Sequence, residues 1–417
     1  MRTVGVVLGL FLLAPGLARA EGKFYLKSGD RVVFYGDSIT DQRLYTTFTE
    51  SFVLTRFPSM TITFVHSGWG GDRVTGGGGG PIDVRLKRDV LAYQPTVMTI
   101  MLGMNDAGYQ PFNKGIFETY AKGYEHIVAT MKAQAPGLRL TLIVPSPYDD
   151  VTREPKFEGG YNNVLLRYGE FVKELAKREG ATVADLNTSV VDATKKAKEV
   201  DPKGAEGLNP DRVHPGTGGQ LLMAAALLKA WNAPAIVSDV SIETTGEKAT
   251  AKAENATVSE LQASESSLSW TEQDRSLPFP LNLKDQAVAL ALKASDFADT
   301  LDRQVLAVKG LKEGTYTLSI DGAAVGTYKD QDLASGVNLA TVETPMLKQA
   351  LQVHDLTLRH NSIHFVRWRQ VQVPLQSESS PNIPQALNAL DAVENDLVVV
   401  QRTQTQPSAH RFELRRK

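Results

Sequence analysis

The chain has 417 residues, no cysteine, and a formal net charge of −2 at pH 7 from 45 Lys and Arg against 47 Asp and Glu. The lack of cysteine excludes disulfide bonds and thiolate zinc sites. The nearly balanced charge argues against nucleic acid or an anionic membrane as the main partner, because both need a basic surface. The length predicts two structural units, with enough chain to build a core without covalent crosslinks.

The first 20 residues have the pattern of a secretory signal peptide. Arg2 gives a positive start, residues 4–13 form an apolar stretch, and Ala18-Arg19-Ala20 is a small-x-small cleavage pattern. A buried N-terminal helix is the alternative, but the segment has no polar face. We therefore expect cleavage near Ala20, which removes Arg2 and Arg19 and moves the formal charge from −2 to −4. The expected location is secreted or periplasmic, and no later stretch approaches the ~20 apolar residues of a membrane span.

Between residues 21 and 235, apolar runs alternate with segments of helical spacing. Near-continuous apolar runs are typical of parallel strands that are buried on both faces. The alternation predicts an α/β domain, a three-layer sandwich with a five-stranded parallel sheet. The apolar runs lie at 31–35, 60–65, 96–102, 138–144 and 181–186, and the clearest helical segments follow Pro81 and cover 117–131 and 164–175.

The second predicted unit, residues 236–417, differs in composition. Residues 236–282 are rich in Ser, Thr, Glu and Ala, with short alternating runs typical of antiparallel strands. Residues 314–328 predict a hairpin with Asp321-Gly322 as its turn pair, and 343–370 predict a helix. We expect a β-rich accessory region with inserted helices that packs closely on the α/β domain, because those helices lack a large core of their own.

Four polar clusters follow predicted elements at the carboxyl edge of the sheet, where parallel α/β folds bind their ligands. The sheet therefore brings a serine, a histidine, an aspartate and several hydrogen-bond donors to one place. The clusters are Gly36-Asp37-Ser38-Ile39-Thr40 after the first strand, His66-Ser67-Gly68-Trp69-Gly70-Gly71-Asp72 after the second, Gly103-Met104-Asn105-Asp106 after the third and Asp211-Arg212-Val213-His214 after the fifth.

These residue types suit acyl transfer. A serine hydroxyl is a poor nucleophile until a base takes its proton, and His214 is the candidate base for Ser38. Asp211, three residues earlier, is in reach of the second ring nitrogen of His214. The tetrahedral oxyanion needs donors, which the backbone N–H groups of Ser38 and Gly71 and the side-chain amide of Asn105 supply.

In their order and their elements, the four clusters resemble the conserved blocks of the SGNH (GDSL-type) hydrolase family, over residues 24–234. The resemblance implies a flavodoxin-like α/β fold and a serine esterase that uses no cofactor and no metal. It makes Ser38, Asp211 and His214 the catalytic triad. By the same resemblance Ser38, Gly71 and Asn105 form the oxyanion hole.

The second cluster departs from the family pattern, because it begins with His66 where the family commonly has asparagine. The pair Gly71-Asp72 is better matched. The sequence does not decide whether Gly70 or Gly71 is the oxyanion donor.

Three other features adjoin the clusters. Trp69, Tyr45 and Tyr109 are candidates for stacking on a sugar ring, although such aromatics are as often core residues. The glycine run 76–80 is either a lip over the site or a linker. The segment 360–369 mixes basic and aromatic residues; it is too short for a nucleic-acid surface, and we expect a helix that packs on the α/β domain.

The sequence predicts a secreted esterase that hydrolyses acetyl or other short acyl esters through a Ser-His-Asp acyl-enzyme mechanism. A polysaccharide or other carbohydrate ester is the expected substrate, by analogy with the β-rich appendages of polysaccharide-active enzymes. Two alternatives stay open. A lipid or lysophospholipid esterase predicts a large exposed apolar patch at the cleft, and a non-catalytic carbohydrate-binding protein predicts a degraded catalytic set. The acyl group, the alcohol, the role of residues 236–417 and the oligomeric state are left undetermined.

Overall fold

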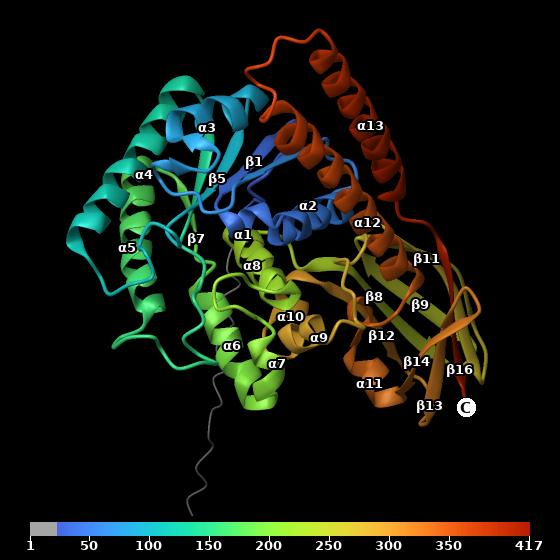
Figure 1. The fold of residues 1–417 in the computed structure, drawn as a ribbon. Helices are drawn as coiled ribbons and strands as arrows, with labels where there is room; N and C mark the ends of the chain where they lie inside the picture. Colours follow the sequence, from blue (N-terminus) through green and yellow to red (C-terminus); the bar gives the residue numbers. More distant parts are fainter. Residues whose placement is uncertain (1–22) are drawn as a thin grey trace, which may run out of the picture.

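The computed structural model describes residues 23–417, shown in Figure 1. The signal-peptide prediction for residues 1–20 lies outside the described residues.

The first half of the chain is built on a five-stranded parallel sheet in the order β2-β1-β5-β6-β7. The central strands β1 and β5 are buried along almost their whole length, which explains their continuous apolar sequences. The predicted five-stranded parallel sheet is confirmed, although the second strand starts three residues later than the apolar run suggested. The strands are β1 (Arg31–Gly36), β2 (Thr63–Gly68), β5 (Val97–Met101), β6 (Arg139–Ile143) and β7 (Thr182–Ala184).

Helices cover both faces of this sheet (Figure 1). The chain steps from β1 to β2 in one direction and from β2 through β5 and β6 to β7 in the other. Because parallel crossovers are right-handed, α2 lies on one face and α3, α4 and α5 lie on the other. Helix α8 packs against α2. The helices are α1 (Ser38–Asp41), α2 (Leu44–Arg56), α3 (Ile82–Asp89), α4 (Lys114–Gln134), α5 (Tyr161–Glu179), α6 (Thr188–Val200), α7 (Pro202–Glu206) and α8 (Thr217–Ala230), with a 3-10 turn at Leu91–Tyr93.

Helices α4 and α8 illustrate how sequence sets position. Asn113 caps α4 by accepting a hydrogen bond from the Ile116 N–H (3.1 Å), and the buried face of α4 carries Tyr120, Tyr124 and Met131. Helix α8 is apolar on nearly every side, because it packs between α2, α6 and α9 (Gln286–Lys293).

The second half contains two further sheets, with strand orders β15-β12-β8-β9 and β10-β11-β16-β13-β14. The predicted β-rich character is confirmed, and Asp321 and Gly322 form the β13–β14 turn with φ of 50° and 79°. Within residues 236–282, β8 pairs with β9 and β10 with β11 in the antiparallel manner expected, and β8 pairs in parallel with β12 on its other side. The strands are β8 (Ile236–Thr245), β9 (Lys248–Glu254), β10 (Ala256–Ala263), β11 (Ser267–Asp274), β12 (Arg303–Lys309), β13 (Thr315–Ile320), β14 (Ala323–Lys329), β15 (Val337–Asn338) and β16 (His410–Arg416).

Two long helices of this half lie across the α/β half (red in Figure 1). α12 (Pro345–Phe365) packs on α2 and α13, and it continues into a π-helical segment, Val366–Gln372. α13 (Asn382–Gln404) runs beside α12 and leads to β16. Two shorter helices of this half are α10 (Phe297–Leu301) and α11 (Asp330–Ser335), and a 3-10 turn covers Leu339–Thr341.

The two hydrophobic cores do not divide at one position in the chain. The core around the five-stranded sheet includes Phe279, Val288 and Phe297 from the second half. The core of the other two sheets includes Leu54 of α2. The change in amino-acid composition after residue 235 coincides with the start of β8. The division of the chain into two domains at that residue stays a prediction.

A buried ionic cluster joins α12 to the α/β half. The carboxylate of Glu50 on α2 accepts hydrogen bonds from His66 (3.0 Å), His360 (2.8 Å) and Asn361 (3.2 Å). Burial raises the pKa of Glu50, but the charge and hydrogen bond of His360 and the bond from His66 outweigh it and lower that pKa to about 2. Burial lowers the pKa of His360, but Glu50 and Glu394 raise it to about 10. A protonated His360 between two carboxylates therefore holds α12 against α2.

We expect His360→Gln to destabilise the protein most at low pH. The unfolded histidine titrates near pH 6.5 and the folded one near 10, so the contribution of His360 is complete below 6.5 and disappears as the pH rises to about 10. The variant should unfold about 2–5 °C below wild type at pH 6, and the difference should shrink toward pH 10. Thermal unfolding from pH 6 to 10 tests this, with His126→Gln, at an exposed pair with Asp83, as the control. A difference that does not depend on pH contradicts the expectation.

Candidate active site

The structure brings Ser38, His214 and Asp211 into a connected row. The Oγ atom of Ser38 lies 2.8 Å from Nε2 of His214, and Nδ1 of His214 lies 2.7 Å from Oδ2 of Asp211. The other oxygen of Asp211 accepts hydrogen bonds from the backbone N–H groups of Val213 (2.9 Å) and His214 (2.7 Å). Asp211 therefore fixes both the backbone and the ring of His214. The histidine is in hydrogen-bond reach of the proton it must take.

The turn that presents Ser38 is tightly packed. A side chain at Gly36 would meet the carbonyl oxygen of Met101 at 2.7 Å, so only glycine fits where β1 ends. Asp37 caps α1 by accepting a hydrogen bond from the Ile39 N–H (3.0 Å). Burial raises the pKa of Asp37 to about 7. Its contacts are with the backbone of its own turn, in keeping with a structural rather than a catalytic part.

The two candidate glycines of the second cluster differ in how their N–H groups are used. The N–H of Gly70 donates to Oδ2 of Asp41 (3.1 Å). Gly71 has φ of +77°, and within residues 23–417 its N–H donates no hydrogen bond. Of the two groups, the Gly71 N–H is the one available to an incoming oxyanion.

The Asn105 side chain is oriented at both ends. Its Nδ2 donates to the carbonyl oxygen of Asp72 (3.1 Å), and its Oδ1 accepts from the Tyr109 hydroxyl (3.1 Å). An amide nitrogen carries two hydrogens, so the second one is left to donate elsewhere. Asp106, the next residue, accepts from the Val74 N–H (2.9 Å), and burial raises its pKa to about 7. The third cluster thus holds the second one in place.

An open cleft of about 510 Å³ lies beside Ser38. It is bounded by the α1–α2 segment on one side and by the turn that carries Asp211 and His214 on the other. Gln42, Leu44 and Thr217 contribute to its wall, so the lining mixes polar and apolar groups. A more apolar cleft of about 530 Å³ adjoins it at Leu44 and Thr217, and its lining includes Phe48, Leu281 and Leu351.

The predicted aromatic binding surface is largely wrong. Tyr45 is fully buried, with its hydroxyl 3.0 Å from the Thr40 hydroxyl, because α2 turns it into the core against Phe34. Trp69 is 8% exposed. The guanidinium carbon of Arg369 covers its ring at 3.0 Å from the ring centroid, so no sugar can stack there. Tyr109 alone keeps an exposed ring next to the site, with 42% of its surface accessible.

Two features that the sequence left open acquire structural explanations. His66, the departure from the family pattern, is buried and bonded to Thr46 (2.7 Å) and Glu50, so it belongs to the ionic cluster under α12. The glycine run 76–80 is neither a lip nor a linker. It forms the short hairpin of β3 (Gly76–Gly77) and β4 (Gly80–Pro81), and a side chain at Gly79 would meet the Trp69 ring at 2.7 Å.

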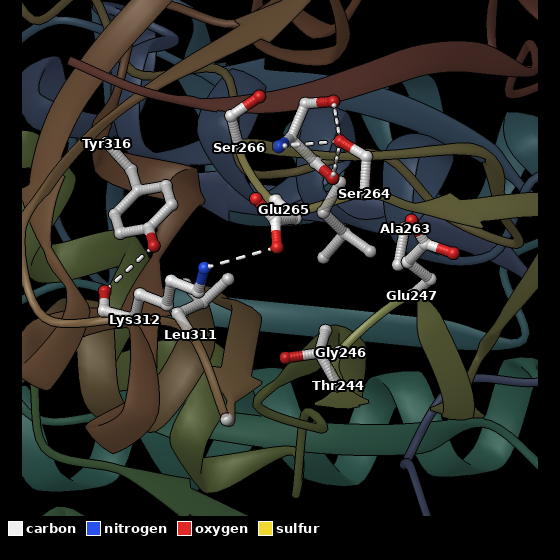
Figure 2. Close-up of a pocket in the computed structure, with 13 residues that line it drawn as sticks. Thr244, Gly246, Glu247, Ala263, Ser264, Glu265, Ser266, Leu311, Lys312 and Tyr316 are labelled. Carbon is white, nitrogen blue, oxygen red and sulfur yellow. Dashed lines mark hydrogen bonds and ion pairs between the residues drawn. The ribbon is translucent and has the colours of Figure 1, made fainter.

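A second cavity, of about 200 Å³, is formed by turns of the C-terminal sheets (Figure 2). Its polar groups bond to one another. The Tyr316 hydroxyl donates to the carbonyl oxygen of Lys312 (2.8 Å), and the Lys312 ammonium lies 3.8 Å from Glu265. None of its lining residues lines the Ser38 cleft.

Residues 23–417 contain neither a candidate metal site nor a candidate membrane-spanning helix. No group of three or more His, Asp or Glu side chains in this range is arranged to hold a metal ion. None of the helices in the described part has the length and apolar character of a membrane crossing.

Known proteins resemble this chain in sequence and in structure. The sequence model of the GDSL-like lipase/acylhydrolase family matches residues 34–222. An acetylxylan esterase of Geobacillus stearothermophilus is 25% identical in an alignment of 224 residues, which covers 48% of this chain and 94% of the relative. The solved structure of BT4096, described as a gut microbial diltiazem-metabolizing enzyme, has a TM-score of 0.80 and 27% identity, and the match covers 94% of this chain and 98% of that one.

The fold and these relatives define an ester-hydrolysing serine hydrolase. Residues 34–222, a little under half of the chain, match the SGNH, or GDSL-type, hydrolase family. The likeness to BT4096 extends over nearly the whole described chain, including the C-terminal sheets and helices.

We expect Asn105→Ala to lower kcat by about 10²–10³-fold with little change in KM, because an oxyanion donor acts mainly in the transition state. Hydrolysis of p-nitrophenyl acetate gives both constants. Asn163→Ala, at an exposed asparagine of α5, is the matched control and should behave as wild type. A kcat for Asn105→Ala within twofold of wild type would exclude the side chain as a donor.

Proposed function

We propose that this protein is a secreted serine esterase that removes acetyl or other short acyl groups from a carbohydrate. The observation that carries the proposal is the unbroken row from Ser38 through His214 to Asp211, with distances of 2.8 Å and 2.7 Å. Export rests on the signal-peptide pattern of residues 1–20.

The first half of the reaction forms an acyl-enzyme. His214 Nε2 takes the hydroxyl proton as Ser38 Oγ attacks the ester carbonyl. The backbone N–H groups of Ser38 and Gly71 and the Asn105 amide donate to the oxyanion that develops. The intermediate collapses with cleavage of the ester C–O bond, and His214 gives its proton to the departing alcohol.

The second half returns the enzyme to its starting state. Water loses a proton to His214 and attacks the acyl carbonyl, and the same donors stabilise the second oxyanion. The bond to Ser38 Oγ then breaks, the serine regains its proton from His214, and the carboxylic acid leaves.

Asp211 keeps the histidine in the required orientation throughout. Partial burial raises the pKa of Asp211, but the hydrogen bonds from the His214 backbone and ring and from the Val213 N–H outweigh it and lower that pKa. The carboxylate is therefore ionised at neutral pH. It accepts a hydrogen bond from the Nδ1–H group of His214, stays ionised, and stabilises the imidazolium as it forms.

Several observations favour a short acyl group on a polar alcohol. The acetylxylan esterase from Geobacillus stearothermophilus shares the α/β half of the chain. The cleft beside Ser38 is open, and the polar side chains of Asp41, Gln42 and Thr217 line it together with apolar groups, which suits a small polar alcohol. The name of BT4096 makes a small non-carbohydrate ester, of the kind diltiazem represents, the second candidate. The intact triad argues against a non-catalytic binding protein.

We expect Ser38→Ala to lower the hydrolysis rate of p-nitrophenyl acetate by at least about 10⁴-fold. The loss follows because no other residue supplies the attacking oxygen. Labelling with a fluorophosphonate should disappear in the same variant, while its unfolding temperature stays near that of wild type. Equal rates for the variant and the wild type would end the esterase proposal.

We also expect kcat/KM to fall at least about 10-fold from p-nitrophenyl acetate to p-nitrophenyl octanoate, because the cleft beside Ser38 is open and partly polar. Acetate release from acetylated xylan, mannan, pectin and acetylated monosaccharides then identifies the alcohol. The Ser38→Ala variant is the background control for each substrate. Rates that rise with acyl length would favour a lipid esterase instead.

A further inference from the structure

The loop that carries the candidate oxyanion glycine, residues 69–72, is covered from outside by the C-terminal half. The guanidinium carbon of Arg369 lies over the Trp69 ring, 3.0 Å from the ring centroid. The Trp368 ring meets Trp69 edge-on at 5.6 Å. Gly79 also lies against the Trp69 ring, so closely that a side chain there would clash with it. The first residue of the loop is thus fixed between a hairpin of the α/β half and two residues that are about 300 positions later in the chain.

Arg369 also reaches the hydrogen bond that sets the glycine backbone. Its Nη2 lies 3.8 Å from Oδ2 of Asp41, the same oxygen that accepts the Gly70 N–H at 3.1 Å. Burial raises the pKa of Asp41, and Arg369 is the largest of the influences that oppose it. Arg369 therefore stabilises the carboxylate that accepts the hydrogen bond from the Gly70 N–H, next to the Gly71 N–H, which donates no hydrogen bond within residues 23–417.

The far end of the loop, at Asp72, is connected to the segment that carries Trp368 and Arg369. The Trp368 indole N–H donates to Asp89 (2.6 Å), and Asp89 is paired with Arg85. Arg85 in turn bonds to Oδ2 of Asp72 (2.8 Å), at the end of the loop. The carbonyl of Asp72 is the acceptor that orients Asn105. Both predicted non-serine donors are thus supported by contacts that lead to residues 368 and 369.

The local backbone of the C-terminal segment is unusual. Residues Val366–Gln372 are π-helical, a rare conformation that is concentrated at functional sites. Trp368 is buried and Arg369 is largely covered. The ordinary α12 helix ends at Phe365, directly before the residues that contact the loop.

We propose that Arg369 is a positioning residue for the oxyanion hole, which makes the C-terminal half a working part of the esterase site. Through the stack on Trp69 and the pair with Asp41, it holds loop 69–72 so that the Gly71 N–H points at the developing oxyanion. Catalysis gains because the donors are fixed before the reaction begins. The inference rests on the proposed function and assigns a role to residues outside the family region at 34–222.

The test compares Arg369→Ala with Arg367→Ala, which removes the same charge two residues away. Arg367 pairs with Asp391 of α13 and does not touch the loop. Arg369→Ala should lower kcat on p-nitrophenyl acetate by about 10–50-fold with KM within about twofold, and Arg367→Ala should keep the wild-type kcat. Rates are expressed per site labelled by fluorophosphonate, so that partly unfolded protein does not count.

If Arg369 had a purely structural role, the active enzyme molecules counted by fluorophosphonate labelling would bind a transition-state analogue with unchanged affinity. Phenylboronic acid forms a tetrahedral adduct on the serine, so its inhibition constant should rise in parallel with the fall in kcat/KM. Asp41→Asn should show the same pattern, and the double variant should lose much less than the product of the two single effects. Arg369→Lys, which keeps the charge near Asp41, should recover part of the rate. If Arg369→Ala does not fold, the comparison is made with Arg369→Lys and Asp41→Asn instead.

The outcomes separate the two proposals. Full activity in Ser38→Ala overturns the esterase function itself. If Ser38→Ala is inactive while Arg369→Ala keeps the wild-type kcat and inhibition constant, the esterase stands and the positioning role is wrong. Equal losses in Arg369→Ala and Arg367→Ala would likewise reduce the effect to docking of the C-terminal helices.

Discussion

The hydrogen bond between Ser38 and His214 joins two turns that are 176 positions apart, and the arrangement of the α/β half is what allows it. Ser38 follows the central strand β1, and His214 precedes α8. The distance between the two turns is therefore set by how α8 packs on α2. Gln220 of α8 fixes that packing, because its Oε1 accepts the Tyr45 N–H (3.1 Å) and its Nε2 donates to Gln42 (2.6 Å). The buried side chain of Gln220 thus helps to determine whether the base reaches the nucleophile.

Much of this site could be predicted from sequence because its parts are local. A parallel strand brings the residues after it to one edge of the sheet, so four short clusters were enough to indicate Ser38, Asn105, Asp211 and His214. The Asp321-Gly322 hairpin was predictable for the same reason, since the turn type depends on two adjacent residues. Contacts between segments that are distant in the sequence could not be predicted. Nothing near Tyr45 or Trp69 in the sequence shows that one is core and that Arg369 covers the other.

The C-terminal half could be recognised as β-rich but not placed. Its strands alternate weakly, and alternation does not say which strand pairs with which, so the parallel β8–β12 pair and the position of β16 had no local signal. The tie between Glu50 and His360 spans 310 positions. The acetylxylan esterase relative matches 48% of this chain, and BT4096 shares nearly all of it. An account of the site from the family region alone leaves out the residues that cover loop 69–72.

The place of β16 has a kinetic consequence. It follows the other four strands of its sheet in sequence, yet it lies at the centre, between β11 and β13. Until β16 inserts, that sheet exists only as two separate hairpins, β10–β11 and β13–β14, each marginal alone and each with an open edge. Closing the gap joins residues 267–274 to 410–416, a loop whose closure is entropically costly and slow. The sheet β10-β11-β16-β13-β14 can therefore be completed only when the last strand of the chain is available, although the first of its strands lies about 150 positions earlier.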